Sequence, residues 1–428
     1  MILKIEKLIY EGFGLGHDEN GRAIFVKKSV PGDTLEVEVI KDKKKYAEAR
    51  IVKVIEPSKL RIEPKCPHFA ECGGCDFQNI GYADQLKFKE AYFKETLERQ
   101  KVETEILPII SSRSDFYYRN TISFQFMEVD GQISLAMYDY LDYKKLIPIK
   151  TCLLQSETAI LIMNAVVDWA NENEIKNLRS LRLREGKRTD DYMVEIFTSS
   201  SQLANTVELR EKLSQIPNIK SIYHCYEVDR RVRRNLLSGA TAISEKIGKY
   251  TFTISPESSF QTNGANVEIL YDLIKKFADV KIGESVLDLF CGTGTIGIYL
   301  STFAKKVVGI ELNQQAVNDA KANAKINKVP NIEFKLADLG RGDQSELFNE
   351  KFDVVVIDPP RAGLTVELIE SLSKLSAPNS RLVYVSCDPA TFARDIIEFQ
   401  KYGRELKKVQ SLDMFPQTYH LECVGLIS

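Results

Sequence analysis

A glycine-rich turn between an apolar run and a helix-like segment constrains the fold of this chain more than any other stretch. Residues 284–297 read ESVLDLFCGTGTIG, with the apolar run at 285–290. An apolar run followed by a glycine cluster predicts a buried strand, a tight turn and then a helix. Glycines let the backbone approach a ligand closely, and the helix N-terminus offers free N–H groups. A second predicted strand, at 306–311, ends in Glu311, whose carboxylate suits the two hydroxyls of a ribose.

By itself, this turn fits either a dinucleotide-binding fold or a methyltransferase. Asp288 lies where the turn begins. A carboxylate there repels a pyrophosphate, but it attracts the ammonium group of S-adenosylmethionine. The residues of the turn therefore favour a methyltransferase.

The C-terminal part of the chain alternates strand-like and helix-like segments from about residue 255. A helix is predicted at 314–327, with Asn313 as its N-cap. The predicted strands are 285–290, 306–311, 332–336, 353–358, 381–386, 406–412 and 423–427. This alternation is typical of a doubly wound α/β domain, whose ligands lie at the carboxyl ends of the strands.

The rest of the 428 residues is richer in strand patterns. Residues 1–58 contain short β-rich runs with turn signals, which predicts a small barrel. Residues 59–254 are mostly β-patterned, with helices predicted at 82–99 and 157–171. We therefore expect three domains, 1–58, 59–254 and 255–428, with residues 85–115 packing against the last.

Two basic stretches are candidate RNA contacts. Lysines cluster near residues 41–53, and four arginines lie at 230–234. Each stretch fits either a solvated turn or a contact with a nucleic-acid backbone. The formal net charge is only −2, so any such surface is local.

Three cysteines, Cys66, Cys72 and Cys75, form a C-x5-C-x2-C pattern, and Cys152 is the next along the chain. Four thiolates suit an iron–sulfur cluster or a structural zinc ion. The chain has eight cysteines and no signal-peptide core, so we expect a cytoplasmic protein that uses them for metal binding or catalysis rather than in disulfides. No apolar run approaches the about 18 residues of a membrane span.

Unusual residues follow the ends of the predicted strands. Cys387 follows the fifth strand, and Asp388 and Pro389 then suit the start of a helix. A helix N-terminus favours thiolate over thiol. Glu422 precedes the last strand, which in methyltransferases of this fold lies antiparallel beside the fifth. A thiolate and a carboxylate in one crevice suggest a nucleophile and a general base.

Taken together, these motifs make the chain resemble the RNA uracil-5-methyltransferase family over nearly its whole length. The resemblance is to the branch with an N-terminal TRAM domain and an iron–sulfur cluster, typified by the 23S rRNA enzymes. Its marks are PGD at 31–33, CPHFAECGGC at 66–75, SFQTN at 259–263, DLFCGTG at 288–294, DPPRAG at 358–363, SCDPAT at 386–391 and FPQTYHLE at 415–422.

The resemblance implies a class I, Rossmann-like methyltransferase domain, an OB-like TRAM barrel and a β-rich central domain. It implies that Cys387 is the nucleophile and Glu422 the base. The implied ligands of a [4Fe–4S] cluster are Cys66, Cys72, Cys75 and Cys152. The implied S-adenosylmethionine-binding residues are Gln261, Phe290, Thr295, Glu311, Asp338 and Asp358.

The expected reaction is methylation of a uridine C5 in RNA, with 23S rRNA favoured and tRNA as the alternative. No obligate protein partner is expected. A nicotinamide oxidoreductase with an iron–sulfur centre is a rival interpretation, but it leaves SCDP and HLE without a role. A non-catalytic RNA-binding protein is another, against which Cys387 and Glu422 argue.

Overall fold

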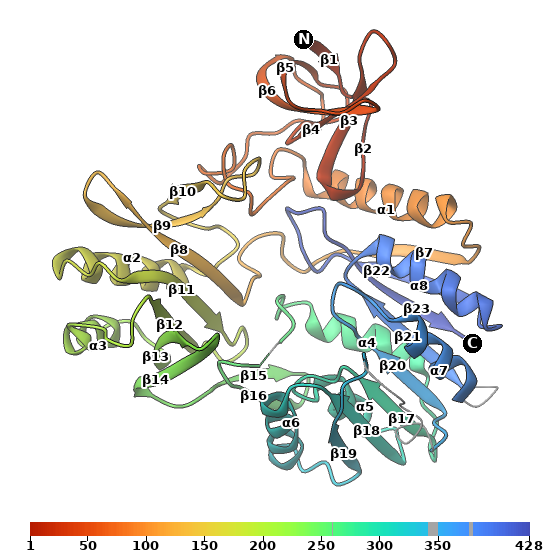
Figure 1. Ribbon diagram of the computed structural model, residues 1–428. Helices are drawn as coiled ribbons and strands as arrows, with labels where there is room; N and C mark the ends of the chain where they lie inside the picture. The colour runs from red at the N-terminus through yellow and green to blue at the C-terminus, as the bar shows by residue number, and fades with distance from the viewer. Residues whose placement is uncertain (259, 341–349, 376–379) are drawn as a thin grey trace.

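The computed structural model describes residues 1–258, 260–340, 350–375 and 380–428. Figure 1 shows an N-terminal barrel, a β-rich central part and a C-terminal α/β part, with helix α1 beneath the barrel. None of the helices in the described ranges is long and apolar enough to cross a membrane.

The N-terminal barrel is a six-stranded sheet in the order β1-β5-β6-β4-β3-β2. Alternate residues of these strands point inward and form a small core that includes Ile24, Val26 and Val37. A short 3₁₀ turn, η1, joins β2 to β3. The elements are β1 (Ile2–Lys4), β2 (Lys7–Leu8), η1 (Tyr10–Gly12), β3 (Phe13–His17), β4 (Ala23–Lys27), β5 (Thr34–Asp42) and β6 (Tyr46–Glu56).

The central part is a seven-stranded sheet in the order β10-β9-β8-β11-β12-β13-β14. Helices α2 and α3 pack on it around the fully buried Trp169. The elements are β8 (Thr121–Val129), β9 (Gln132–Tyr138), β10 (Leu146–Ile149), α2 (Glu157–Glu172), β11 (Leu178–Glu185), β12 (Tyr192–Thr198), α3 (Thr206–Ser214), β13 (Ile219–Val228) and β14 (Arg231–Gly239). A two-stranded ribbon, β15 (Ile243–Ile247) and β16 (Tyr250–Ile254), leads to the C-terminal part.

The C-terminal sheet has eight strands in the order β19-β18-β17-β20-β21-β23-β22-β7. All its neighbouring pairs are parallel except those made by β23. The strands are β7 (Glu105–Ile110), β17 (Ser285–Leu289), β18 (Lys306–Glu311), β19 (Ile332–Leu336), β20 (Val354–Ile357), β21 (Arg381–Ser386), β22 (Leu406–Leu412) and β23 (Glu422–Ile427). The predicted α/β fold is confirmed, including the antiparallel last strand beside the fifth.

Helices cover both faces of this sheet because its strands are apolar on both faces. Within β17, Val286 faces one core and Leu287 the other. The core around Leu287 includes side chains of α1, α7 and α8, and the core around Val286 those of α4, α5 and α6. The helices are α1 (Tyr82–Arg99), α4 (Val267–Ala278), α5 (Thr295–Leu300), α6 (Gln314–Ile326), α7 (Val366–Leu375) and α8 (Pro389–Lys401).

Strand β7 and helix α1 come from far upstream in the chain. β7 pairs in parallel with β22, and α1 packs on β7 and α8. Figure 1 shows both elements beside the C-terminal sheet. Residues 82–110 therefore add one strand to the edge of the C-terminal sheet and one helix to one of its faces.

Candidate active site and cysteine cavity

One cavity of about 650 Å³ opens at the carboxyl ends of β17, β18, β20 and β21. We call it the strand-end cavity. Eight residues that the sequence singled out line it together: Gln261, Phe290, Thr295, Glu311, Asp338, Asp358, Cys387 and Glu422. Parallel strands bring their ends to one edge, so residues up to 161 positions apart converge (422 − 261).

Glu311 is fixed by backbone N–H groups at the end of β18. Its carboxylate accepts from the Gly292 N–H at 3.0 Å and from the Asn313 N–H at 2.8 Å. Asn313 also caps α6 through its side chain, as the sequence predicted. Beside it, Gly294 has a φ of +77°, and a Cβ there would lie 2.5 Å from the Phe334 ring. The turn therefore holds the Glu311 carboxylate facing the strand-end cavity, in a position that suits the ribose hydroxyls of a nucleoside.

Asp358 lies deeper in the cavity. Its Oδ2 accepts a hydrogen bond from the Gln261 amide at 3.0 Å. Burial raises the pKa of Asp358 to about 7. Thr295 shares a hydrogen bond of 2.6 Å with the Tyr271 hydroxyl beneath the cavity. Ser259, the first residue of the SFQTN motif, lies outside the described residues.

Asp288 has a different place from the one expected. It is fully buried under the turn, it does not line the cavity, and its Oδ2 accepts from the Gly297 N–H at 2.8 Å. Burial raises its pKa to about 8. Its Oδ2 therefore fastens helix α5 to strand β17, while its Oδ1 is buried without a hydrogen-bond partner among the described residues. That Asp288 attracts the ammonium of the cofactor stays a prediction.

Cys387 lies between the end of β21 and the start of α8. Asp388 caps α8 by accepting from Ala390 and Thr391, with Pro389 at the first turn, as predicted. Burial, first, and then the nearby Glu422 raise the pKa of Cys387 to about 12, although Arg361 lowers it. The free protein therefore holds Cys387 as a thiol with a cation nearby.

Glu422 begins β23, directly beside the end of β21. Ser386 pairs with Cys423 across the two strands, so Cys387 and Glu422 reach the same cavity from neighbouring strands. Burial and the nearby Asp358 raise the pKa of Glu422 well above its usual value. A buried carboxylate of this kind takes up a proton readily.

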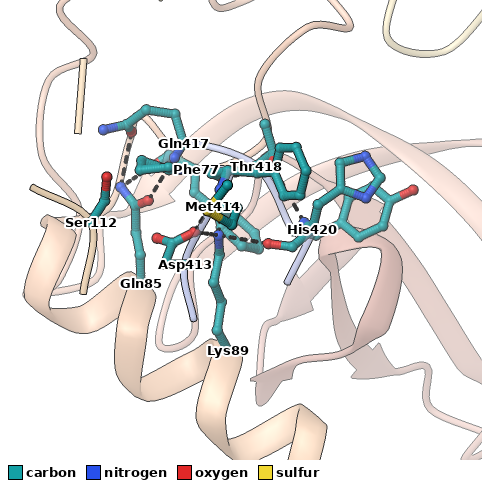
Figure 2. Close-up of polar contacts among 12 residues, drawn as sticks. Phe77, Gln85, Lys89, Ser112, Asp413, Met414, Gln417, Thr418 and His420 are labelled. Carbon is teal, nitrogen blue, oxygen red and sulfur yellow. Dashed lines mark hydrogen bonds and ion pairs between the residues drawn. The ribbon is translucent and has the colours of Figure 1, made fainter. Parts of the chain in front are cut away.

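The loop before Glu422 is held by helix α1. Lys89 is fully buried and donates to the Asp413 carboxylate at 2.7 Å and to the carbonyls of Phe415 and His420 at 3.0 and 2.9 Å. Figure 2 shows Lys89 and Gln85 reaching from α1 into this loop. Gln85 donates to the Gln417 side chain at 2.9 Å and accepts from its backbone N–H at 3.1 Å.

Sequence reasoning missed Lys89. It lies three residues after Leu86 and four before Phe93, on the apolar stripe of α1. A lysine at such a position signals a buried partner. The partner itself, 324 residues away, has no local signal.

A second cavity, of about 320 Å³, is lined by Cys66, Cys72, Cys75 and Cys152. We call it the cysteine cavity. Two N–H donors point at sulfur: the Gln78 amide to Cys75 at 3.3 Å and the Gly74 backbone to Cys72 at 3.4 Å. Burial, first, and the thiols of Cys72 and Cys66 raise the pKa of Cys152 to about 11.

Four cysteines are the number of ligands that an iron–sulfur cluster takes. Within the described ranges, however, no group of three or more His, Cys, Asp or Glu side chains is placed to hold a metal ion.

Arg119 connects the two cavities. It lines both of them, with Thr262, and its guanidinium donates to the Thr121 carbonyl at 3.0 Å.

The two basic stretches lie on hairpins. Arg231 and Arg233 are exposed on β14, while Arg234 pairs with Glu195 and Glu257. Lys43, Lys44 and Lys45 are exposed between β5 and β6.

The strand order, the glycine turn and the cavity at the strand ends define a class I S-adenosylmethionine-dependent methyltransferase. Residues 81–428 match the family model described as tRNA (uracil-5-)-methyltransferase, and residues 2–52 match that of the TRAM domain. The chain belongs to this uracil-5-methyltransferase family, and its N-terminal barrel is a TRAM domain. The enzyme is therefore an RNA methyltransferase.

Two relatives cover nearly the whole chain. A protein of Clostridium tetani described as an uncharacterized RNA methyltransferase is 34% identical, over 98% of this chain and 94% of its own. One of Halalkalibacterium halodurans with the same description is 33% identical, over 99% and 95%.

A solved structure resembles the whole chain. The Pyrococcus abyssi tRNA (uracil-54, C5)-methyltransferase in complex with S-adenosyl-L-homocysteine is 28% identical. It has a TM-score of 0.78, with 100% of both chains covered.

Proposed function

We propose that this enzyme methylates C5 of a uridine in RNA by transient covalent attachment of Cys387. The observation that carries the proposal is the convergence of Cys387, Glu422 and the six predicted cofactor residues on one cavity. Membership of the uracil-5-methyltransferase family supports the same chemistry.

Uracil C5 is a poor nucleophile, and Cys387 supplies the activation. Its thiol gives up its proton to solvent, the resulting thiolate forms a bond to C6, and the C5–C6 electron pair moves so that C5 becomes enolate-like. Arg361 stabilises the thiolate, because a nearby cation lowers the pKa of Cys387. The target base must leave its stack to enter the cavity.

Glu422 completes the reaction as the base. After C5 has taken the methyl group, Glu422 removes the C5 proton, and the C6–S bond breaks with return of the thiolate. Its burial favours proton uptake.

S-adenosylmethionine supplies the methyl group on a sulfonium. Glu311 would bind the ribose hydroxyls, since its carboxylate is held facing the cavity by two N–H donors. Gln261, Phe290, Thr295, Asp338 and Asp358 would line the rest of its site.

The four cysteines of the cysteine cavity would hold a [4Fe–4S] cluster. Such a group has no task in the methyl transfer and would be structural. It would join the segment of Cys66, Cys72 and Cys75 to Cys152 between the barrel and the central sheet.

We propose 23S rRNA as the substrate, on the resemblance to the iron–sulfur branch and on the four cysteines that line one cavity. tRNA is the second candidate, because the similar Pyrococcus abyssi enzyme acts on tRNA uracil-54. The exposed lysines of the barrel hairpin suit contact with either RNA backbone.

The test uses 23S rRNA and tRNA transcripts containing 5-fluorouridine. Fluorine at C5 cannot leave as a proton, so the covalent adduct is trapped after methyl transfer. With S-adenosylmethionine present, we expect an adduct on a denaturing gel with 23S rRNA, and none with Cys387→Ala.

An adduct with tRNA alone would reassign the substrate and keep the mechanism. No adduct with either RNA, from protein with confirmed cofactor binding, would refute addition at C6.

A further inference from the structure

The 3₁₀ turn of the TRAM barrel reaches the loop that carries Cys387. The Tyr10 hydroxyl donates a short hydrogen bond to Oδ2 of Asp388, 378 residues away. The other oxygen of Asp388 accepts from Ala390 and Thr391 at 3.0 and 2.9 Å and caps helix α8. One carboxylate next to the nucleophile is therefore tied to a helix on one side and to the barrel on the other.

The ring of Tyr10 is held between two other tyrosines. It packs edge-on against Tyr92 of α1 at 6.0 Å and against Tyr419 at 5.5 Å between ring centroids. The Tyr92 hydroxyl in turn donates to the Tyr419 carbonyl. Burial first, and then the hydrogen bond to Asp388, raises the pKa of Tyr10, so the hydroxyl remains a donor at neutral pH.

The turn itself is anchored from both sides. Lys27 of β4 donates to the Glu11 carbonyl and forms an ion pair with Asp76 at 3.4 Å. Asp76 accepts from the Tyr419 N–H at 3.2 Å. Glu11 has a φ of 66°, a left-handed conformation that a non-glycine residue adopts only when its surroundings hold it.

Docking of the barrel alone does not require the hydroxyl of Tyr10. The ring contacts of Tyr10 with Tyr92 and Tyr419 already join the barrel to the C-terminal part that carries Cys387. The Lys27–Asp76 ion pair joins the barrel to the segment before α1. The hydroxyl adds a directed bond to the residue that follows Cys387. A bond to a charged acceptor is stronger and more directional than a neutral one.

We propose that Tyr10 is a positioning residue for methyl transfer, whose hydroxyl holds Asp388 and so sets the Cys387 thiolate at the mouth of the strand-end cavity. The inference rests on the proposed function. It gives the TRAM barrel a part in turnover as well as in RNA binding. A small displacement of a reacting group costs rate, and about 1 Å can cost about a hundredfold.

The test compares Tyr10→Phe with the wild-type enzyme. This variant keeps the ring and removes the hydroxyl. We expect kcat to fall about tenfold, equivalent to about 1.4 kcal/mol, while KM for RNA stays within about twofold. The rate of adduct formation on 5-fluorouridine RNA should fall with kcat. Tyr143→Phe, at an exposed tyrosine between β9 and β10, is the control and should change neither constant.

A double-mutant cycle with Asp388→Asn provides the second measurement. If Tyr10 acts through Asp388, the double variant should be no slower than Asp388→Asn alone. Additive losses of kcat would overturn the proposal. So would a kcat within about twofold of wild type in Tyr10→Phe, or a loss that lies entirely in KM for RNA. Failure of the wild-type enzyme to form any adduct would refute the proposed function instead.

Discussion

The strand-end cavity and the cysteine cavity are neighbours built from similar parts. Both contain half-buried or buried cysteines, and both share Arg119 and Thr262 in their walls. They differ in what surrounds the sulfur. Cys387 has three carboxyl groups and the Arg361 guanidinium as neighbours. Cys75 has two further thiols, those of Cys152 and Cys72, besides the nearby Asp76.

This difference indicates that the charged groups and thiols around a buried cysteine determine which chemistry that cysteine can perform. Several thiols around one cavity raise each other's pKa, although Lys28 lowers that of Cys72 and Arg119 that of Cys152. A cationic group held between them would favour their ionised form further. A single thiol with a guanidinium and a carboxylate nearby can ionise when a substrate enters and can hand a proton to a base. The first arrangement suits a structural group, and the second suits covalent catalysis.

The largest expected effect separates the two kinds of cysteine. Cys387→Ala should lower methyl transfer from labelled S-adenosylmethionine to RNA by at least about 10⁴-fold, because the variant lacks the thiolate that adds to C6 of the base. Cys225→Ala, at a buried cysteine of β13, is the control and should retain activity. Activity in Cys387→Ala within about tenfold of wild type would remove the nucleophile from the mechanism.

Glu422→Gln should slow the release of methylated RNA from Cys387 more than the attack of Cys387 on C6. Without the base, the C5 proton stays, so turnover should fall by about 10²- to 10⁴-fold. A covalent complex with ordinary uridine RNA should then accumulate on a denaturing gel. Glu311→Gln is the contrast, since it should raise KM for S-adenosylmethionine without accumulating a complex. A Glu422→Gln enzyme that turns over slowly with no trapped complex would contradict the assignment.

Cys72→Ser addresses the other cavity. If the proposed cluster is present, wild-type protein purified without oxygen contains iron, and we expect the variant to contain little of it. The variant should also unfold at a temperature lower by about 5 °C or more, because a structural ligand set would be broken. Methyl transfer should fall far less than in Cys387→Ala. Cys225→Ser serves as the control. Iron content that stays at the wild-type level would argue against a cluster at these four cysteines.

The sequence predicted the parts of the fold that depend on local pattern. The strands β18, β19, β21 and β22 have the bounds expected from their apolar runs. Helix α1 does too, and Asn313 and Asp388 cap helices as predicted. Each of these features depends on residues close together in the chain, where periodicity and capping chemistry act.

Local pattern did not predict which distant segments come into contact, beyond the expectation that residues 85–115 pack against the C-terminal domain. The pairing of β7 with β22, the Lys89–Asp413 pair and the Tyr10–Asp388 bond join residues about 300 or more positions apart. Asp288 is a different case. Its motif predicts a ligand contact, but the side chain is fully buried and bonds to the Gly297 N–H of helix α5. Residues close together in the sequence carry no signal for a contact with a distant segment, and burial changes the role of a charged side chain.

The smallest predicted effect tests whether the charge of Arg361 contributes to the difference between Cys387 and the thiols of the cysteine cavity. Arg361 lowers the pKa of Cys387, so removing its charge should raise that pKa. Below its pKa, the thiolate fraction rises about tenfold per pH unit, and alkylation follows the thiolate. Arg361→Met should therefore slow alkylation of Cys387 by iodoacetamide by about two- to fivefold at every pH from about 7 to about 9.

Arg394→Met is the matched control for this measurement. Arg394 lies on α8 and pairs with Asp395 at 2.6 Å, and it is not among the groups that shift the pKa of Cys387. Its loss should leave alkylation unchanged. Faster alkylation in Arg361→Met would mean that the side chain shields the thiol more than it stabilises the thiolate. In that case the difference between the two cavities would lie in access to the sulfur rather than in charge.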